Sequence, residues 1–213
     1  GAFAFAGQRC TANRRVIVHA ADFEKFVTQL ESAAARLRWG DPLDPETEIG
    51  PVLSPAKRDE FESLVALAKT GGAHRMIFPQ STRASEPWAK SGAYAQPVIA
   101  CCDEPEHPLV QEENMSPLLV VQRADDFAQA LALCNGVRHG LIASLFSQSA
   151  DLQKKFLEEA RAGVLKFNSS TAGVDITLPF GGWKASGLGP PEHGDGDIQF
   201  YTHLQAVYGL DIL

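Results

Sequence analysis

A cysteine near the start of the chain stands in a setting that suits covalent catalysis. Cys10 directly follows Gly7-Gln8-Arg9, where the glycine lets the backbone turn sharply. The adjacent Arg9 adds positive potential that favours the thiolate, which is the attacking species in covalent catalysis. Backbone N–H groups around such a turn could hold a developing oxyanion. Cysteine is also often a small buried core residue, so the pattern alone leaves a structural role open.

Two further clusters could take part in the same chemistry. Glu112 and Glu113 precede Asn-Met-Ser-Pro, and without a partner these carboxylates would form only a solvated turn. Asn168 is followed by Thr-Ala-Gly-Val-Asp at 171–175 and by a glycine-rich run at 179–187. Such a run could cradle phosphate, but neither a GxGxxG after a strand nor a P-loop sequence is present. On its own it predicts a tight irregular loop.

Alternating strands and helices must position these clusters. Strands are predicted at 16–18, 75–78, 97–101, 118–121, 141–146 and 164–167, with a further extended run at 200–208. Helices are predicted from Asp22 to beyond Leu37, from Pro55 to Gly71, after Asp125 or Asp126, and over 151–162 with Gly163 as cap. This order predicts an α/β fold with a mainly parallel sheet covered by helices on both faces. We expect a catalytic body at 1–178, and at 179–213 a closing loop and an extended β tail.

Composition excludes several classes of protein. The 213 residues are 45% hydrophobic and 21% charged, with a net charge of -7 and no basic cluster, which argues against nucleic acid as a partner. No apolar run approaches the roughly 20 residues that span a bilayer. The four cysteines show no CxxC spacing, and no HExxH occurs, so no metal site is expected. The six histidines are interpreted as surface or core residues. So few thiols favour a cytoplasmic location.

Taken together, the motifs resemble the catalytic part of the NAD(P)-dependent aldehyde dehydrogenase superfamily. The resemblance covers nearly all of the chain, with its motifs in the family's order and at fitting spacing. It rests on Gly7–Cys10, on Gly40-Asp41-Pro42 through Gly50-Pro51, on Gln111–Pro117, on Asn135 through Leu141, and on Asn168 with Pro179-Phe180-Gly181-Gly182.

The resemblance implies roles for single residues. Cys10 matches the nucleophile that attacks the aldehyde carbon, after which the thiohemiacetal passes hydride to NAD or NADP and water hydrolyses the thioester. Glu113 matches the carboxylate that contacts the nicotinamide ribose. Phe180 matches an aromatic at the mouth of the substrate tunnel, and Asn168 lies where the family shapes its substrate site.

The chain departs from the family pattern in two ways. In the Glu-Glu-x-Phe-Gly-Pro box, Met115 and Ser116 replace the phenylalanine and the glycine, although methionine can still pack on a ribose or nicotinamide face. The family's dinucleotide-binding segment, general-base glutamate and side-chain oxyanion donor precede the cysteine. Since only nine residues precede Cys10, we expect a fragment that lacks the main cofactor-binding domain, folds, and oxidises no aldehyde alone.

Within the superfamily, the chain is similar to the 2-oxoglutarate semialdehyde (2,5-dioxopentanoate) dehydrogenases at Gly7–Ala12, Thr171–Asp175 and Gln199–Thr202. Succinylglutamate semialdehyde and pyrroline-5-carboxylate dehydrogenases share parts of the pattern and remain alternatives. In the last group, residues matching Thr11, Ala172 and Gly173 anchor the substrate carboxylate through exposed backbone donors. The resemblance therefore favours a small aldehyde substrate that carries a carboxylate. Arg14 and Arg15 could also attract an acidic substrate, or lie at a strand start.

Two hypotheses from other classes remain. Cys10 could support a non-redox thiol esterase or acyl transferase. The chain could instead be an inert assembly module, since 200–213 resembles the family's C-terminal strand, which joins a neighbouring subunit's sheet. That strand also predicts a homo-oligomer.

Overall fold

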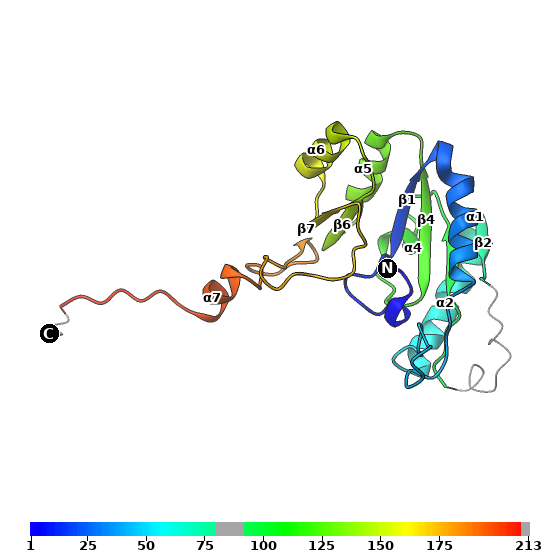
Figure 1. Cartoon of the computed structure of the whole chain (residues 1–213), viewed down its shortest axis with the longest axis horizontal. Coiled ribbons are helices and arrows are strands. Elements are labelled where there is room, and N and C mark those ends of the chain that lie inside the picture. Colours follow the sequence, from blue (N-terminus) through cyan, green and yellow to red (C-terminus); the bar gives the residue numbers. More distant parts are fainter. Residues whose placement is uncertain (80–91, 210–213) are drawn as a thin grey trace.

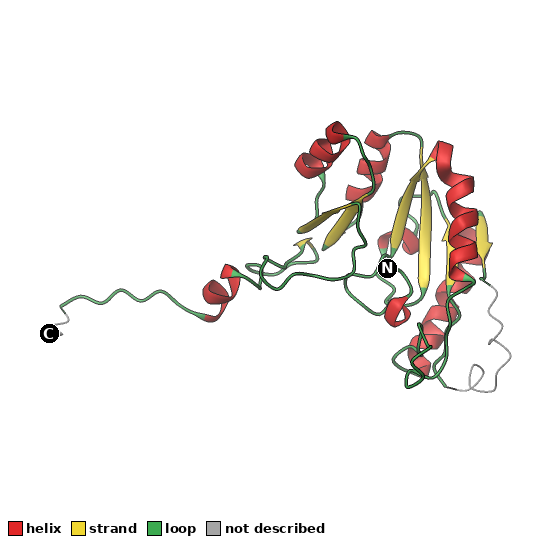
Figure 2. Cartoon of the chain, viewed as in Figure 1, coloured by secondary structure: helices red, strands yellow, loops and turns green. Residues whose placement is uncertain are grey.

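Strands and helices alternate along the computed structural model, which describes residues 1–79 and 92–209 (Figures 1 and 2). The strands are β1 Arg15–His19, β2 Arg75–Ile77, β3 Val98–Cys101, β4 Leu118–Ala124, β5 His139–Gly140, β6 Ile142–Leu145, β7 Val164–Phe167 and β8 Trp183–Lys184. The helices are α1 Phe23–Ala34, α2 Pro55–Gly71, α4 Pro108–Gln111, α5 Phe127–Asn135, α6 Ala150–Glu159 and α7 Asp195–Tyr201, with 3-10 turns η1 Ala4–Gly7 and η2 Ala20–Asp22. The predicted α/β class is confirmed.

The strands form one larger sheet and two small ones. The larger sheet has the order β1-β4-β3-β2, in which β4 pairs in parallel with β1 and β3, while β2 is an antiparallel edge strand. Strands β6 and β7 form a separate parallel pair, and β5 pairs antiparallel with β8. The mainly parallel arrangement matches the prediction, but the strands are divided between sheets.

Two hydrophobic clusters hold these layers together. All four residues of β3 and most of β4 are buried, as expected for parallel strands covered on both faces. Phe23 and Val27 of α1, with Phe61 and Val65 of α2, belong to this main core. Leu131 of α5 and Phe156 of α6 form a second cluster, which packs on β6 and β7.

The first residues of the helices agree with the prediction more closely than the last residues do. Ser54 Oγ accepts the Lys57 N–H at 3.2 Å and Asp126 Oδ1 accepts the Gln129 N–H at 2.8 Å, so both helices begin as predicted. In contrast, α1 ends at Ala34 and does not continue past Leu37. The side chain of Asp22, the predicted cap of α1, makes no capping hydrogen bond.

The prediction that Gly163 caps α6 was wrong. The helix ends earlier, at Glu159, because the Asn135 side chain donates to the Glu159 carbonyl (2.9 Å) and accepts the Arg161 N–H (2.8 Å). Gly163 is required for another reason: a Cβ there would overlap the Gly181 carbonyl. It permits close packing of the glycine-rich loop on the body.

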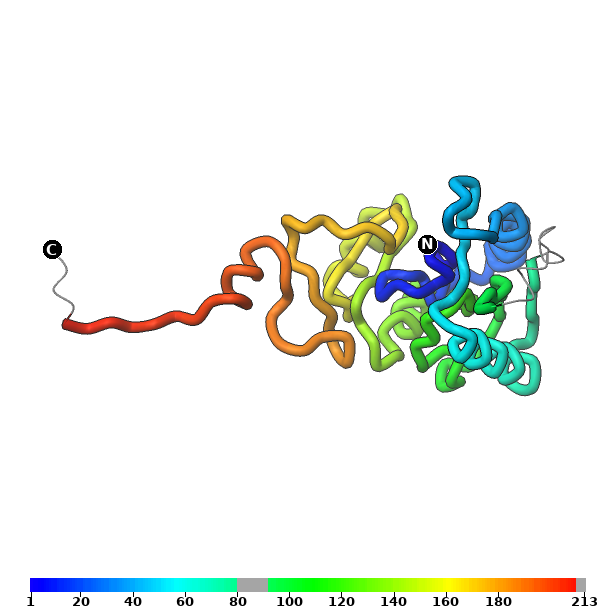
Figure 3. The backbone as a smooth tube through the Cα atoms, turned by 90° about the horizontal axis from the view of Figure 1, so that it is seen from below, coloured from blue at the N-terminus to red at the C-terminus, as the bar shows by residue number. Residues whose placement is uncertain are grey.

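The C-terminal segment differs from its prediction. Residues 195–201 form α7, with Asp195 and Asp197 in its first turn, where carboxylates favour the positive end of a helix. Phe200 and Tyr201 are therefore helical rather than extended. Residues 202–209 leave the body as an extended segment (Figures 1 and 3), and within the described chain they pair with no strand. Residues 210–213 of the predicted tail lie outside the described residues. No helix described here is long and apolar enough to cross a membrane.

Arg15 joins three elements of the body. From the start of β1 it donates to Gln122 Oε1 (2.9 Å) on β4 and to the carbonyls of Leu133 (3.0 Å) and Cys134 (3.2 Å) in the last turn of α5. Burial lowers the pKa of Arg15, but its charge is favoured at a helix C-terminus. It is a structural residue rather than an attractor of acidic substrates.

Arg15→Met is expected to lower the free energy of unfolding by about 2–4 kcal/mol, because it leaves buried acceptors without donors. Urea denaturation measures this loss. The control Arg123→Met removes an exposed ion pair with Asp125 and should cost about 0.5 kcal/mol or less. Equal losses in the two variants would contradict the structural role of Arg15.

Candidate active site

One cavity of about 800 Å³ brings distant parts of the sequence together. Cys10, Glu113, Met115 and Thr171 all line it. Its remaining wall includes every residue of β1 and of β6, together with one side of α5. The segment that carries Cys10, the Glu-Glu box and the loop after β7 therefore share a single space.

A tight turn presents Cys10 at the surface of this cavity. The Ala12 N–H donates to the Arg9 carbonyl at 3.0 Å, which places Cys10 and Thr11 at the centre of the turn. Cys10 is exposed, whereas Thr11 is buried. The Arg9 guanidinium lies 3.6 Å from the centroid of the Phe5 ring, a cation–π contact that keeps positive charge beside the turn.

Gly7 and Gln8 fix the approach to this turn. Gly7 has φ +71°, and a Cβ there would overlap the Ser116 carbonyl, so only glycine lets the two segments approach closely. The Gln8 side chain accepts the Leu53 N–H at 2.7 Å and donates to the Pro51 carbonyl at 3.4 Å. The turn is therefore held between the Glu-Glu box and the segment at 51–53.

The Glu-Glu box forms a strained turn that its own asparagine supports. Met115 has φ +43°, in the left-handed region, and Asn114 Oδ1 accepts the Ser116 N–H at 3.2 Å. The Asn114 amide also donates to the Leu118 carbonyl at 3.4 Å. The exposed Glu113 and the half-buried Met115 thus line the cavity from a fixed backbone.

Arg14 and Arg138 bind the first glutamate of the box. Arg14 donates to the carbonyls of Val110 and of Glu112, the latter at 2.9 Å, while Arg138 pairs with the Glu112 carboxylate. Burial, helped by the neighbouring Arg15, lowers the pKa of Arg14 to about 10, so it remains charged at neutral pH. Because its donors are used by backbone carbonyls, Arg14 positions the box.

The other residues predicted for the substrate site lie outside the lining of this cavity. The exposed Asn168 uses its amide to bind Ser147, accepting its N–H at 2.9 Å and donating to its carbonyl at 3.1 Å. Phe180 pairs with Glu192 through an isolated β-bridge and stacks on His193 with ring centroids 5.5 Å apart. Both residues shape loops rather than the wall beside Cys10.

The predicted carboxylate anchor is a compact turn. The Ala172 N–H donates to Ser170 Oγ at 3.1 Å, so an anion would compete for that donor. The Lys166 ammonium donates to the Ala172 carbonyl at 2.8 Å and to the Gly173 carbonyl. Gly173 is exposed, with open space where a Cβ would lie. Lys166 therefore brings a positive charge to this turn.

Three residues here were not predicted as site residues. Lys166 occupies an ordinary strand position. Thr171 belongs to the Thr-Ala-Gly-Val-Asp segment, but its spacing does not indicate what its hydroxyl contacts. His139 lines the cavity, and its buried Nδ1 has no hydrogen-bond partner among residues 1–79 and 92–209. Burial, with Arg14 nearby, lowers the pKa of His139, so its imidazole is neutral at pH 7.

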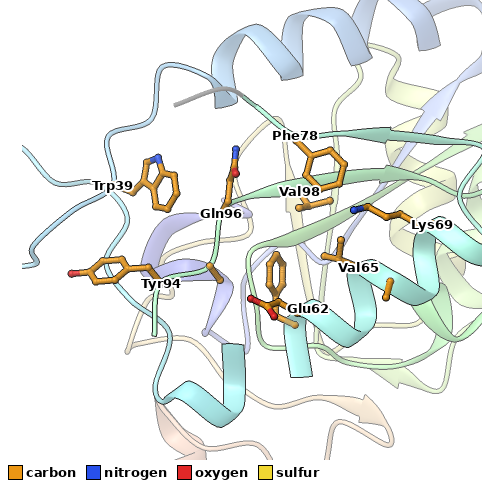
Figure 4. A pocket seen from close by; sticks show the side chains of 11 residues that line it. Trp39, Glu62, Val65, Lys69, Phe78, Tyr94, Gln96 and Val98 are labelled. Atoms are coloured by element: carbon orange, nitrogen blue, oxygen red, sulfur yellow. The ribbon is translucent and has the colours of Figure 1, made fainter. Parts of the chain in front are cut away.

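A second cavity, of about 410 Å³, lies away from these residues. Figure 4 shows Trp39, Tyr94 and Phe78 around it, with Lys69 and Glu62 on the side of α2. None of the predicted site residues lines it. It is therefore not part of the candidate active site.

Comparison with known proteins identifies the family. The model of the aldehyde dehydrogenase family matches residues 1–207. The chain belongs to the aldehyde dehydrogenase family. It is 32% identical over 208 residues to the alpha-ketoglutaric semialdehyde dehydrogenase of Bacillus subtilis, covering 98% of this chain and 42% of that protein. It is 33% identical to the aminoacetaldehyde dehydrogenase of Pseudomonas aeruginosa, covering 98% of this chain and 40% of that one.

Solved structures of aldehyde dehydrogenases agree with the fold. A putative aldehyde dehydrogenase from Burkholderia cenocepacia superposes with a TM-score of 0.86 at 30% identity, covering 95% of this chain and 41% of that one. A betaine aldehyde dehydrogenase from Staphylococcus aureus, solved with NAD+, gives 0.85 at 27% identity, covering 92% and 39%. The chain thus spans about two fifths of the length of these relatives.

Exposure separates Cys10 from the other thiols of this aldehyde dehydrogenase chain. Burial raises the pKa of Cys101 to about 11 and also raises the pKa of Cys102 and of Cys134. Iodoacetamide at neutral pH is therefore expected to label Cys10 alone in the native protein, and all four cysteines after unfolding. Mass spectrometry of the labelled peptides measures this. Equal native labelling of Cys134 would contradict it.

Proposed function

We propose that this chain carries the nucleophile of an aldehyde-oxidising site and the carboxylate that receives the nicotinamide end of NAD(P). The observation that carries the proposal is the shared cavity, which is lined by Cys10 and Glu113 although 103 positions separate them. Glu113 and Met115 fit the cofactor because an exposed carboxylate can accept ribose hydroxyls, while a thioether packs on a flat ring.

In the proposed reaction, the Cys10 thiolate attacks the aldehyde carbon and an S–C bond forms. Backbone N–H groups of the turn are the proposed donors to the oxygen that becomes negative. NAD(P), when bound, supplies the acceptor for the hydride released from that carbon. Water then cleaves the thioester on Cys10, which releases the acid and restores the thiol. Because the chain spans about two fifths of the length of its relatives, we expect the 213 residues alone to oxidise no aldehyde.

The proposed substrate is a semialdehyde with a carboxylate, of which 2-oxoglutarate semialdehyde is the first candidate. The turn at Ala172 and Gly173, with the Lys166 ammonium beside it, supports an anion subsite near the buried Thr11. Relatives named for other aldehydes match at similar identity, so the names alone do not choose the substrate. Succinylglutamate semialdehyde and pyrroline-5-carboxylate remain the alternatives.

The direct test is the full gene product assayed with a panel of semialdehydes and neutral aldehydes, using NAD and NADP in turn. We expect the highest kcat/KM with 2-oxoglutarate semialdehyde. Oxidation of neutral aldehydes with equal kcat/KM would overturn the proposed substrate class. Failure to oxidise any aldehyde with either cofactor would overturn the proposed activity.

Ala172→Trp is expected to raise the KM for the semialdehyde about tenfold or more, because an indole would fill the anion subsite. The KM for propanal, which has no carboxylate, should change less than about twofold. A tenfold rise corresponds to roughly 1.4 kcal/mol, a reasonable value for one charge-assisted hydrogen bond. An unchanged KM for the semialdehyde would contradict the proposed role of the Ala172 turn in binding the carboxylate.

Two other proposals concern the thiol and the tail. A non-redox thiol esterase is the competing chemistry, because an exposed Cys10 could attack esters. Ester hydrolysis without any cofactor, at rates matching aldehyde oxidation, would favour it. We also propose that the apolar tail, with Leu204, Val207 and Tyr208 exposed, joins a second copy of the chain. An inert assembly module would show this association without any chemistry at Cys10.

A further inference from the structure

A buried hydrogen bond links the turn that holds Cys10 to the loop after β7. The hydroxyl of Thr171 donates to the Thr11 carbonyl at 2.7 Å. Thr171 is 4% exposed and Thr11 is 7% exposed, so water competes little for this bond. It joins segments 160 positions apart in the sequence.

The bond acts on the peptide group that closes the turn. The carbonyl of that group belongs to Thr11 and accepts from Thr171, while its N–H belongs to Ala12 and donates to Arg9 at 3.0 Å. Both polar ends of one peptide plane are therefore held. Cys10 precedes this peptide by one residue, so a rotation of the plane would move the thiol.

The loop that carries Thr171 is itself anchored. Ser144 of β6 donates to the Ser169 carbonyl at 2.6 Å, and Lys166 of β7 donates to the Ala172 carbonyl at 2.8 Å. These contacts hold the loop on each side of Thr171. The hydroxyl therefore acts from a support fixed to two strands, and not from a free loop.

We propose that Thr171 is a positioning residue, whose hydroxyl holds the Thr11–Ala12 peptide and thereby sets the orientation of the Cys10 thiol. This inference rests on the proposed function, in which Cys10 is the nucleophile. Thr171 also directly precedes the proposed anion subsite at Ala172. A substrate bound there contacts the same loop that holds the nucleophile turn, so the thiol and the carboxylate share one rigid frame.

The test compares Thr171→Val, which keeps the shape and loses the hydroxyl, with Thr171→Ser, which keeps the hydroxyl. In Thr171→Val, deuterium exchange at the Ala12 amide should become about five- to tenfold faster, as the loss of one buried hydrogen bond implies. In the full gene product, kcat should fall at least about tenfold with KM within about twofold, because a misplaced nucleophile lowers the rate of reaction and not binding. Thr171→Ser should restore both values to within about threefold.

Thr177→Val is the matched control, since the Thr177 hydroxyl also makes a 2.7 Å bond, to Asp175, but at the surface. It should change neither readout. If Thr171→Val does not fold, Thr171→Cys, which has a weaker donor, takes its place. Its Ala12 exchange rate and its kcat should lie between the parental values and those expected for Thr171→Val.

Unchanged Ala12 exchange, or a loss of kcat that Thr171→Ser fails to restore, would overturn the positioning role. Full activity in Cys10→Ser would instead remove Cys10 as nucleophile. That outcome would overturn the proposed function. It can be distinguished from failure of the positioning role, because Ala12 exchange reports the Thr171 hydrogen bond independently of activity.

Discussion

Cys10→Ser in the full gene product is expected to lower kcat for aldehyde oxidation by at least about a thousandfold, with the fold unchanged. Removal of a catalytic nucleophile costs this much or more, because a hydroxyl at neutral pH is a far weaker nucleophile than a thiolate. The substitution changes one exposed atom and fits the same turn. The rate of NAD(P)H formation measures the loss, and thermal unfolding verifies that the fold is intact.

Cys101→Ala provides the control for Cys10→Ser. Cys101 is fully buried in β3, so its replacement affects packing and not chemistry. Activity within about twofold of the parent is expected at temperatures where the variant is folded. If Cys10→Ser kept a tenth of the parental activity, neither a dehydrogenase nor an esterase mechanism through Cys10 would stand.

The sequence predicted where elements form because local rules govern their cores and their starts. Buried strands such as β3 and β4 are apolar runs, and Ser54 and Asp126 are caps that act on the next turn. Helix ends were less predictable. The end of α6 depends on Asn135, a side chain on another helix that no local pattern identifies.

The candidate site was predictable only as separate motifs. Family resemblance named Cys10, Glu113 and Met115, and all three line one cavity. Their distances depend on tertiary contacts, such as the Thr171 hydroxyl on the Thr11 carbonyl, which have no signature in sequence spacing. Likewise, the helix at 195–201 was missed for two reasons. Its first residues, Asp-Gly-Asp, continue the glycine-rich stretch, while Phe200 and Tyr201 are β-prone and suit an extended chain.

Gly7 connects local structure with tertiary structure, since a local backbone requirement there determines a long-range contact. Its φ of +71° lets the chain turn before Cys10, and its missing side chain lets the turn approach Ser116, which follows Met115 in the Glu-Glu box. The distance between Cys10 and Glu113, the proposed nucleophile and the proposed cofactor carboxylate, therefore depends on a residue that carries no functional group.

Gly7→Ala is accordingly expected to lower the free energy of unfolding by about 2–4 kcal/mol and to reduce kcat about a hundredfold. The left-handed φ alone costs about 1 kcal/mol with a Cβ present, and the rest comes from overlap with a backbone carbonyl that has no flexible end. A displacement of about 1 Å between Cys10 and the box would account for the rate. Gly189→Ala separates the two terms, because Gly189 has φ +81° but open space around it. Gly189→Ala should lower the free energy of unfolding by only about 1 kcal/mol in urea denaturation and should keep its activity.

Equal losses of unfolding free energy in Gly7→Ala and Gly189→Ala would mean that the close approach of Gly7 to Ser116 adds nothing to the strain of the turn.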